Sequence, residues 1–337
     1  MIQPKVSIVV AFYNEEQYIS KAIDSVLNQT YDNIELILVN DGSTDRSEAI
    51  INGYDDNRIK YICYYPNKRQ GYARNRGIEQ ATGDYIMFFD ADDILSADNV
   101  KKKVDFLVNN PDIILVSNGY YTMDSSGNIV GKPIIPMYIE DMEIKAEIPF
   151  CNPIAFAGGG MIRRRILDEH SIWFNENLVG SEDYLFWVNI IPYGKVANLL
   201  DPLFCYRIGH SSHNRTHQNN NLIEYISIME DIHRRGWEFW DIHLTSNQHE
   251  FLSRYLYDRR FIHSVRDFII GLSIIKSIKL QLENNNPNGK ILYKRYWAKL
   301  LDCTLLGRCI MIIYRRSRRK YLVSKRRYEN IVNQALN

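Results

Sequence analysis

Two aspartates separated by one residue, Asp90 and Asp92, are the strongest candidates for chemistry in this sequence. They follow the apolar run 85–89, so they would emerge where a strand ends at the edge of a sheet. Side chains two residues apart in an extended chain point to the same side, so both carboxylates would face one cavity. A hard divalent cation relieves their repulsion by accepting carboxylate and substrate phosphate oxygens. The alternative is that these aspartates cap the helix expected near residues 97–109 or form an Asx turn.

A second acidic pair, Glu182 and Asp183, precedes an apolar stretch that predicts a short helix. The simple interpretation is structural, because Ser181 is a good N-cap and acids in a first turn favour the helix dipole. An enzyme that transfers a group onto a hydroxyl also needs a carboxylate to take the hydroxyl proton. This pair is the best candidate for that base, and both interpretations can hold together.

Two further polar residues, Asp41 and Arg74, lie at the boundaries of other predicted elements. Asp41 follows the run 34–39 and could accept a hydrogen bond from a base imide, while Gly42 would permit close backbone approach. Arg74 lies at the start of a predicted helix, from which it could reach a nucleotide or its phosphates. The alternatives are a turn for Asp41, with one of residues 43–45 capping the next helix, and a solvated charge for Arg74.

A late polar cluster begins with Arg207 and His210, after the strand expected over residues 196–205. These two side chains could stabilise a departing diphosphate as charge develops, and the alternative is an ordinary polar surface. Zinc binding by His210 with His213 and His217 is not favoured. That spacing would need a helix, which the neighbouring glycine and serines disfavour.

The elements that must position these residues alternate between strand and helix. Apolar runs predict strands, and apolar residues at helical spacing predict the helices between them. This alternation favours right-handed βαβ units, an α/β fold with a mostly parallel sheet and helices on both faces. Ligands bind beyond the carboxyl ends of such strands, where the polar residues lie. The strands are expected at 6–10, 34–39, 59–64 and 85–89, and the helices near 19–27, 45–54 and 72–81.

The rest of the chain divides into three parts. Residues 110–215 mix strand, turn and helix signals. We expect residues 1–215 to form one domain, in which residues 1–110 bind the molecule that donates the transferred group and residues 110–215 face the molecule that accepts it. Residues 216–289 carry aromatic and aliphatic residues at helical spacing and predict a helical accessory region. Residues 290–337 form a basic tail.

Charge is distributed unevenly along the chain. The net charge is +1, but residues 290–337 hold 13 lysines and arginines and 2 acidic residues, so they carry +11 against −10 on residues 1–289. Aliphatic and aromatic residues alternate with these charges, which favours an interfacial helix on an anionic membrane over a nucleic-acid arm. A solvated helix or an oligomer contact is the alternative. We expect neither a secretory signal nor a membrane-spanning helix.

These motifs, taken in order, resemble the family 2 glycosyltransferases, which have the GT-A fold and invert the anomeric centre. The resemblance covers about residues 4–210 and leaves residues 222–337 unmatched. It is carried by VSIVVAFYNE (6–15), SVLNQTY (25–31), VNDGSTD (39–45), ARNRG (73–77), GDYIMFFDADD (83–93) and Glu182-Asp183.

The resemblance implies a donor site. The backbone at Ala11 and Phe12 would hold a nucleoside, usually uridine, together with Asp41 and Arg74. Asp90 would lie against the ribose and the metal.

It also implies the chemistry of transfer. Asp92 would bind Mn2+ or Mg2+ directly and Asp183 would be the base, while Glu182 would orient the acceptor or the donor sugar. His210 matches the family's late residue on the phosphate side. The chain lacks the Gln-x-x-Arg-Trp motif of the processive members, so we expect one sugar to be added per encounter.

We therefore predict a cytoplasmic enzyme, held at the inner face of the plasma membrane by its tail. It would transfer a hexose or N-acetylhexosamine from a UDP-sugar to a lipid-linked glycan of a capsule, O-antigen or other surface polysaccharide. Another nucleotide enzyme is disfavoured, because no glycine-rich phosphate loop follows the first strand. A non-catalytic glycan-binding or scaffold protein is the remaining alternative.

Overall fold

The computed structural model describes residues 3–154, 159–209, 222–257 and 265–285. The chain divides into two compact units, the first built from Met1–Pro136 and Ile154–Thr216 and the second from Met137–Pro153 and His217–Asn337. The predicted basic tail, together with His210, His213 and His217, lies outside the described residues.

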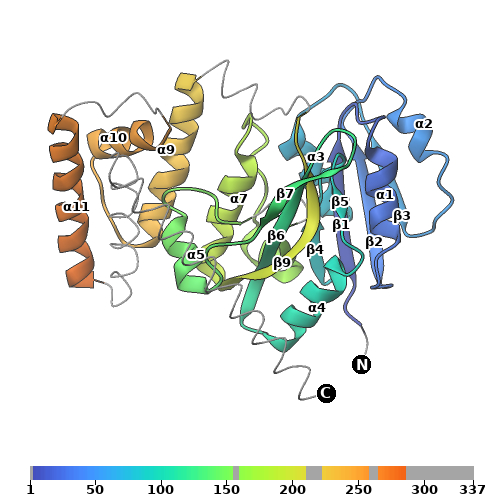
Figure 1. The fold of residues 1–337 in the computed structure, drawn as a ribbon, viewed down its shortest axis with the longest axis horizontal. Coiled ribbons are helices and arrows are strands. Elements are labelled where there is room, and N and C mark those ends of the chain that lie inside the picture. Colours follow the sequence, from blue (N-terminus) through green and yellow to red (C-terminus); the bar gives the residue numbers. More distant parts are fainter. Residues whose placement is uncertain (1–2, 155–158, 210–221, 258–264, 286–337) are drawn as a thin grey trace. The chain divides into compact units, whose positions relative to one another are not determined.

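The first unit is organised around one sheet, whose described strands run in the order β3-β2-β1-β4-β8-β6-β9-β5, with β7 paired to β6 (Figure 1). Strands β1 to β4 pair in parallel, as the alternating pattern predicted. The second half is mixed, because β8 runs antiparallel to both β4 and β6, while β6 and β9 are parallel. The strands are β1 (Val6–Phe12), β2 (Ile34–Asn40), β3 (Ile59–Cys63), β4 (Tyr85–Phe88), β5 (Ile94–Leu95), β6 (Ile113–Met123), β7 (Ile129–Ile134), β8 (Met161–Arg163) and β9 (Lys195–Arg207).

Helices cover both faces of the parallel half. Every residue of β1 and β2 is buried, which is expected of strands enclosed on two sides. Alternate residues such as Ile8 and Leu36 join the apolar faces of α1 and α4 in one core, while Val9, on the opposite face, lies against Gly77 of α3. The helices of this unit are α1 (Ile19–Leu27), α2 (Ser47–Ile51), α3 (Gln70–Gln80), α4 (Asn99–Asn109), α6 (Arg164–His170) and α7 (Glu182–Ile190), with the 3-10 turn η1 (Ile191–Tyr193) after α7.

The second unit is helical in its described part. It contains α5 (Asp141–Glu147), α9 (Leu222–Phe239), α10 (Ser246–Tyr257) and α11 (Val265–Asn285). Trp237 of α9 and Trp240, which directly follows this helix, are both buried. The Trp240 Nε1 donates to the carbonyl of Lys145 at 3.2 Å, so α5 packs with the end of α9. Residues 137–153, which we had placed on the acceptor side, therefore group with these helices. Among the described helices we find none with the length and apolar character needed to cross a bilayer.

Candidate active site

A cavity of about 380 Å³ lies beyond the carboxyl ends of β1, β2 and β4 in the first unit. Its volume is within the usual range for a small-molecule site. Six residues that the sequence singled out line it, namely Ala11, Phe12, Asp41, Asp90, Asp92 and Glu182. Glu15, Gln70 and Tyr206 line it as well.

The wall formed by β1 and β2 is held by backbone pairing. Phe12 is paired with Asn40 in the parallel register, and the Asp41 N–H donates to the Phe12 carbonyl at 2.9 Å. The Asp41 carboxylate accepts the Lys68 N–H at 2.7 Å, and burial raises its pKa. Gly42 adopts a φ of +75°, where a Cβ would lie 3.1 Å from the Asn67 nitrogen. The turn therefore needs glycine, as the sequence suggested.

The structure places Arg46 at the N-cap of the following helix, without a side-chain capping hydrogen bond, and Asp45 one residue before it. The Asp45 Oδ1 accepts the N–H of Ser47, the first residue of α2, at 2.9 Å. Its Oδ2 accepts the Glu16 N–H at 2.9 Å, which fixes the turn after β1 against the turn after β2. Asp45 is therefore a structural residue at the rim of the site.

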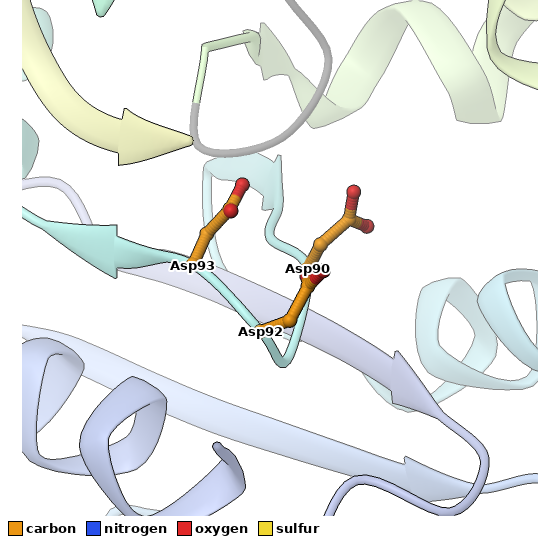
Figure 2. Close-up of side chains that lie close together, drawn as sticks. All are labelled: Asp90, Asp92 and Asp93. Carbon is orange, nitrogen blue, oxygen red and sulfur yellow. The ribbon is translucent and has the colours of Figure 1, made fainter. Parts of the chain in front are cut away.

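The acidic turn after β4 brings three carboxylates together. One oxygen from each of Asp90, Asp92 and Asp93 lies within 4.8 Å of the others, and Figure 2 shows all three side chains leaving the same short turn. The helix-cap alternative is wrong, because β5 intervenes and Asp98 occupies the N-cap position of α4. Asp90 and Asp92 line the cavity, whereas Asp93 is buried beside them.

The electrostatics of this turn fit a divalent cation. Burial raises the pKa of Asp90 to about 6, and the charges of Asp92 and Glu182 add to the shift while Arg74 opposes it. Burial, with Asp92 and Asp90 nearby, also raises the pKa of Asp93 well above its ordinary value. Grouped oxygen ligands of this kind are what Mg2+ or Mn2+ accepts, and such a cation would remove the repulsion.

Arg74 occupies a different place from the one expected. Its Nη1 donates to Glu182 Oε1 at 2.6 Å and its Nη2 to Asp90 Oδ1 at 3.2 Å, and the residue is 3% exposed. The sequence predicted that it would reach the nucleotide or its phosphates, but these two hydrogen bonds run to carboxylates on both sides of the site. Arg74 therefore bridges the acidic turn and the acidic pair of α7.

The acidic pair begins α7. Glu182 is buried and Asp183 is half-buried; burial and the adjacent Glu182 raise the pKa of Asp183 to about 7, with Arg74 opposing the shift. A base whose pKa lies near neutrality is well matched to proton transfer at that pH. Ser181 occupies the N-cap position, as predicted, but its φ is +58° and its side chain makes no capping hydrogen bond.

Asn75 was missed by the sequence reasoning and holds the segment that leads to α7. Its Oδ1 accepts the Phe174 N–H at 2.9 Å, and its Nδ2 donates to the Phe174 carbonyl at 3.0 Å and to Glu176 Oε1 at 2.9 Å. The Phe174 ring then stacks on Phe186 of α7 at 3.9 Å. Asn75 is buried, and only its place next to Arg74 in the sequence could have drawn attention to it.

Arg207 is also placed differently from the expectation. It is 1% exposed, and its Nε donates to the Asp92 carbonyl at 2.6 Å. Its Nη1 donates to the carbonyls of Asp124 and Ser125 in the turn after β6. Arg207 does not line the cavity, and these contacts make it a support of the acidic turn.

Glu15 is a second residue that the sequence reasoning left without a role. It lines the cavity, and its pKa is raised to about 8 by burial and by the charges of Asp92, Asp90 and Asp45. The signal that could have found it is its position, three residues beyond the end of β1 on the edge where the other acids gather.

Comparison with solved structures identifies the class of fold. The chain superposes on residues 1–349 of TarS from S. aureus, solved with UDP-GlcNAc, with a TM-score of 0.59, 19% identity and coverage of 93% of this chain and 92% of that one. It also matches the mannosyltransferase PcManGT from Pyrobaculum calidifontis, solved with GDP-Man and Mn2+, with a TM-score of 0.54, 16% identity and coverage of 94% and 86%. The fold is that of a GT-A glycosyltransferase.

Sequence comparison identifies the family. The profile described as Glycosyl transferase family 2 matches residues 7–171. An uncharacterized glycosyltransferase of Haemophilus influenzae is 42% identical over 130 residues, which are 38% of this chain and about half (52%) of that protein. The Escherichia coli UDP-Glc:alpha-D-GlcNAc-diphosphoundecaprenol beta-1,3-glucosyltransferase WfgD is 30% identical over 61% of this chain and 78% of its own length. The chain belongs to glycosyltransferase family 2.

Proposed function

We propose that this chain is a metal-dependent, inverting glycosyltransferase that uses a UDP-sugar donor. The observation that carries the proposal is the bridge made by Arg74, which joins Asp90 on one side of the site to Glu182 on the other. One buried guanidinium thereby sets the distance between the proposed donor site and the residue next to the proposed base.

The donor half of the proposal uses the wall of β1 and β2 and the acidic turn. The backbone at Ala11 and Phe12, together with Asp41, would hold the uridine, because these residues line the cavity beside the acidic turn. Asp90 and Asp92 would hold the Mn2+ or Mg2+, which neutralises charge on the departing diphosphate. TarS and PcManGT were solved with a nucleotide sugar, which supports a donor of this class.

The acceptor half of the proposal uses the start of α7. Asp183 would take the proton of the acceptor hydroxyl, whose oxygen attacks the anomeric carbon while the bond from that carbon to UDP breaks. The electron pair of the broken bond leaves with UDP. A single displacement of this kind inverts the centre, so an α-linked donor gives a β-linked product. Glu182, fixed by Arg74, would orient the sugars.

The acceptor and the location follow from the relatives and from the tail. WfgD acts on a sugar carried by diphosphoundecaprenol, and we infer that this chain adds a hexose or N-acetylhexosamine to a lipid-linked glycan in surface polysaccharide synthesis. The enzyme would be cytoplasmic and docked on the inner face of the plasma membrane. Residues 1–136 and 154–215 would form the catalytic domain, residues 137–153 and 216–289 the accessory region, and residues 290–337 the membrane-binding tail.

The test of the activity is Mn2+-dependent hydrolysis and transfer with a panel of nucleotide sugars. Asp183→Asn should keep UDP binding and lose transfer by several orders of magnitude, on the order of 10³ or more. Asp92→Ala should lose the Mn2+-dependent part of UDP affinity. Asp168→Asn is the control, because Asp168 pairs with Arg164 on the surface of α6. Near-normal transfer by Asp183→Asn would remove Asp183 from the mechanism.

The membrane proposal has its own test. The full-length protein should co-sediment with anionic vesicles at low salt, and deletion of residues 290–337 should abolish that binding. Unchanged binding after the deletion would show that the tail is not the docking element.

A further inference from the structure

The buried arginine at the end of β9 meets the acidic turn at two points. The Arg207 N–H donates to Asp93 Oδ1 at 2.8 Å, and its Nε donates to the Asp92 carbonyl at 2.6 Å. A third set of contacts reaches the turn between β6 and β7, where Nη1 donates to the carbonyls of Asp124 and Ser125 at 3.0 and 3.1 Å. One side chain therefore connects two loops that are more than thirty residues apart.

The guanidinium is itself held in place. It lies over the ring of Tyr18, with 4.3 Å from Cζ to the ring centroid, and Arg207 is paired with Met123 in the parallel register of β6 and β9. The residue is 1% exposed and is not among those that line the cavity. From outside the cavity, the Arg207 side chain thus holds the Asp92 carbonyl, and the backbone N–H of Arg207 holds the Asp93 carboxylate.

We propose that Arg207 is a positioning residue that sets the acidic turn for metal binding. The inference rests on the proposed function, since it assigns to Asp90 and Asp92 the role of metal ligands. Carboxylates that are already converged bind a cation more tightly than carboxylates on a turn that has to order first. Groups that hold metal ligands in place commonly contribute about 10-fold to 100-fold to metal affinity.

The test measures metal binding rather than turnover. Calorimetric titration of the full-length protein with Mn2+ in the presence of saturating UDP should show binding that is about 10-fold to 100-fold weaker in Arg207→Met than in the wild type. UDP affinity in EDTA should stay within about twofold, because the β1 and β2 wall does not depend on Arg207. Arg207→Lys keeps the charge but loses the fork of donors, so its Mn2+ affinity should fall between the two.

Arg163 of β8 offers a matched control at the opposite end of the strands, beside the amino end of β4. Its Nε donates to the Ile113 carbonyl at 2.8 Å, and its Nη2 donates to the Leu107 carbonyl at 2.7 Å. Arg163→Met removes the same kind of contact from the amino ends of the strands, so it should lower the melting temperature and leave Mn2+ affinity unchanged. The comparison separates a loss of stability from a loss of positioning.

Three results would decide the matter. Weaker Mn2+ binding in Arg207→Met or, should that variant not fold, in Arg207→Lys, with wild-type affinity in Arg163→Met, supports the inference. Wild-type Mn2+ affinity in a folded Arg207 variant overturns it and leaves the proposed function intact. UDP binding by the wild type that ignores Mn2+ overturns the metal site and this inference together.

Discussion

Replacing Arg74 with methionine removes the bridge between the two acidic groups of the site. The side chains of Arg74 and Glu182 are 4% and 6% exposed and are joined at 2.6 Å, so the variant leaves a carboxylate buried without this partner. Breaking a buried pair from one side typically costs about 3–5 kcal/mol. The more exposed contact to Asp90, whose side chain is 26% exposed, adds less.

The expected loss of folding stability in Arg74→Met lies at the lower end of the range of about 3–5 kcal/mol. The reason is that the carboxyl groups of Glu182 and Asp90 can take up a proton in the variant. We expect the free energy of unfolding to fall by about 3 kcal/mol. For a unit of this size that corresponds to a fall in melting temperature of about 6–12 °C. Urea denaturation and thermal scans of the metal-free protein measure both quantities.

The same variant should move the pH dependence of transfer. The wild-type rate should rise with pH through about 7, as Asp183 loses its proton and becomes a base. Arg74 holds the pKa of Asp183 down, so its removal should shift the midpoint to higher pH. Arg74→Lys keeps the charge but cannot donate two aligned bonds, so its midpoint should stay near the wild-type value while its rate falls.

Arg76→Met provides the control on the same helix. Arg76 pairs with Glu79 at 2.6 Å, but both side chains are about one-third exposed (35% and 37%), so the loss should be at most about 1 kcal/mol. Its pH profile should match the wild type. An Arg74→Met variant that loses less than about 1 kcal/mol, or that keeps the wild-type midpoint, would refute the role assigned to the bridge.

Two further predictions concern stability. In the folded chain the pKa values of Glu15, Asp183 and Asp90 are raised to about 8, about 7 and about 6. The folded state therefore binds more protons than the unfolded state over this range. The metal-free protein should lose stability as pH rises from about 5 to about 8. Mn2+ should raise the melting temperature of the protein more at pH 8 than at pH 6, because at pH 8 it need not displace protons from the carboxyl groups. An equal rise at the two pH values in thermal scans would contradict the raised pKa values. Gly83→Ala places a Cβ 2.7 Å from both the Lys5 carbonyl and the Ser7 nitrogen and should cost about 1–3 kcal/mol in urea denaturation without changing UDP affinity. Wild-type stability in that variant would show that the strand start can shift at no cost.

The parallel half of the fold could be predicted because β1, β2 and β4 are buried along their whole length and are mostly apolar, with polar exceptions such as Ser7 and Glu35. The mixed half could not be predicted to the same degree. Strands β5 and β8 have two and three residues, which is too short for any periodicity to be recognised. Strand β6 continues to Met123, well beyond the apolar residues at its start, because its polar end pairs with β9.

The residues of the candidate site could likewise be predicted only in part. Spacing along the chain was enough to find Asp90, Asp92, Glu182 and Asp183, because each pair lies at the end or the start of a recognisable element. The partners of Arg74 and Arg207 were not predictable, since they lie 108 and 115 residues away in the sequence. Both arginines were assigned to the ligand because arginine commonly binds phosphate. In the structure both are buried and donate hydrogen bonds to protein groups.

Neighbouring positions on α3 also bear on how such an enzyme can be altered. Arg74 and Asn75 hold Glu182 and the backbone of Phe174, so residues 174–186 are not an independent module of acceptor recognition. A loop exchange that imports this segment from a relative has to bring a compatible pair at 74 and 75 as well. Without that pair, the imported segment would lose the contacts that hold Glu182, the neighbour of the proposed base, in place.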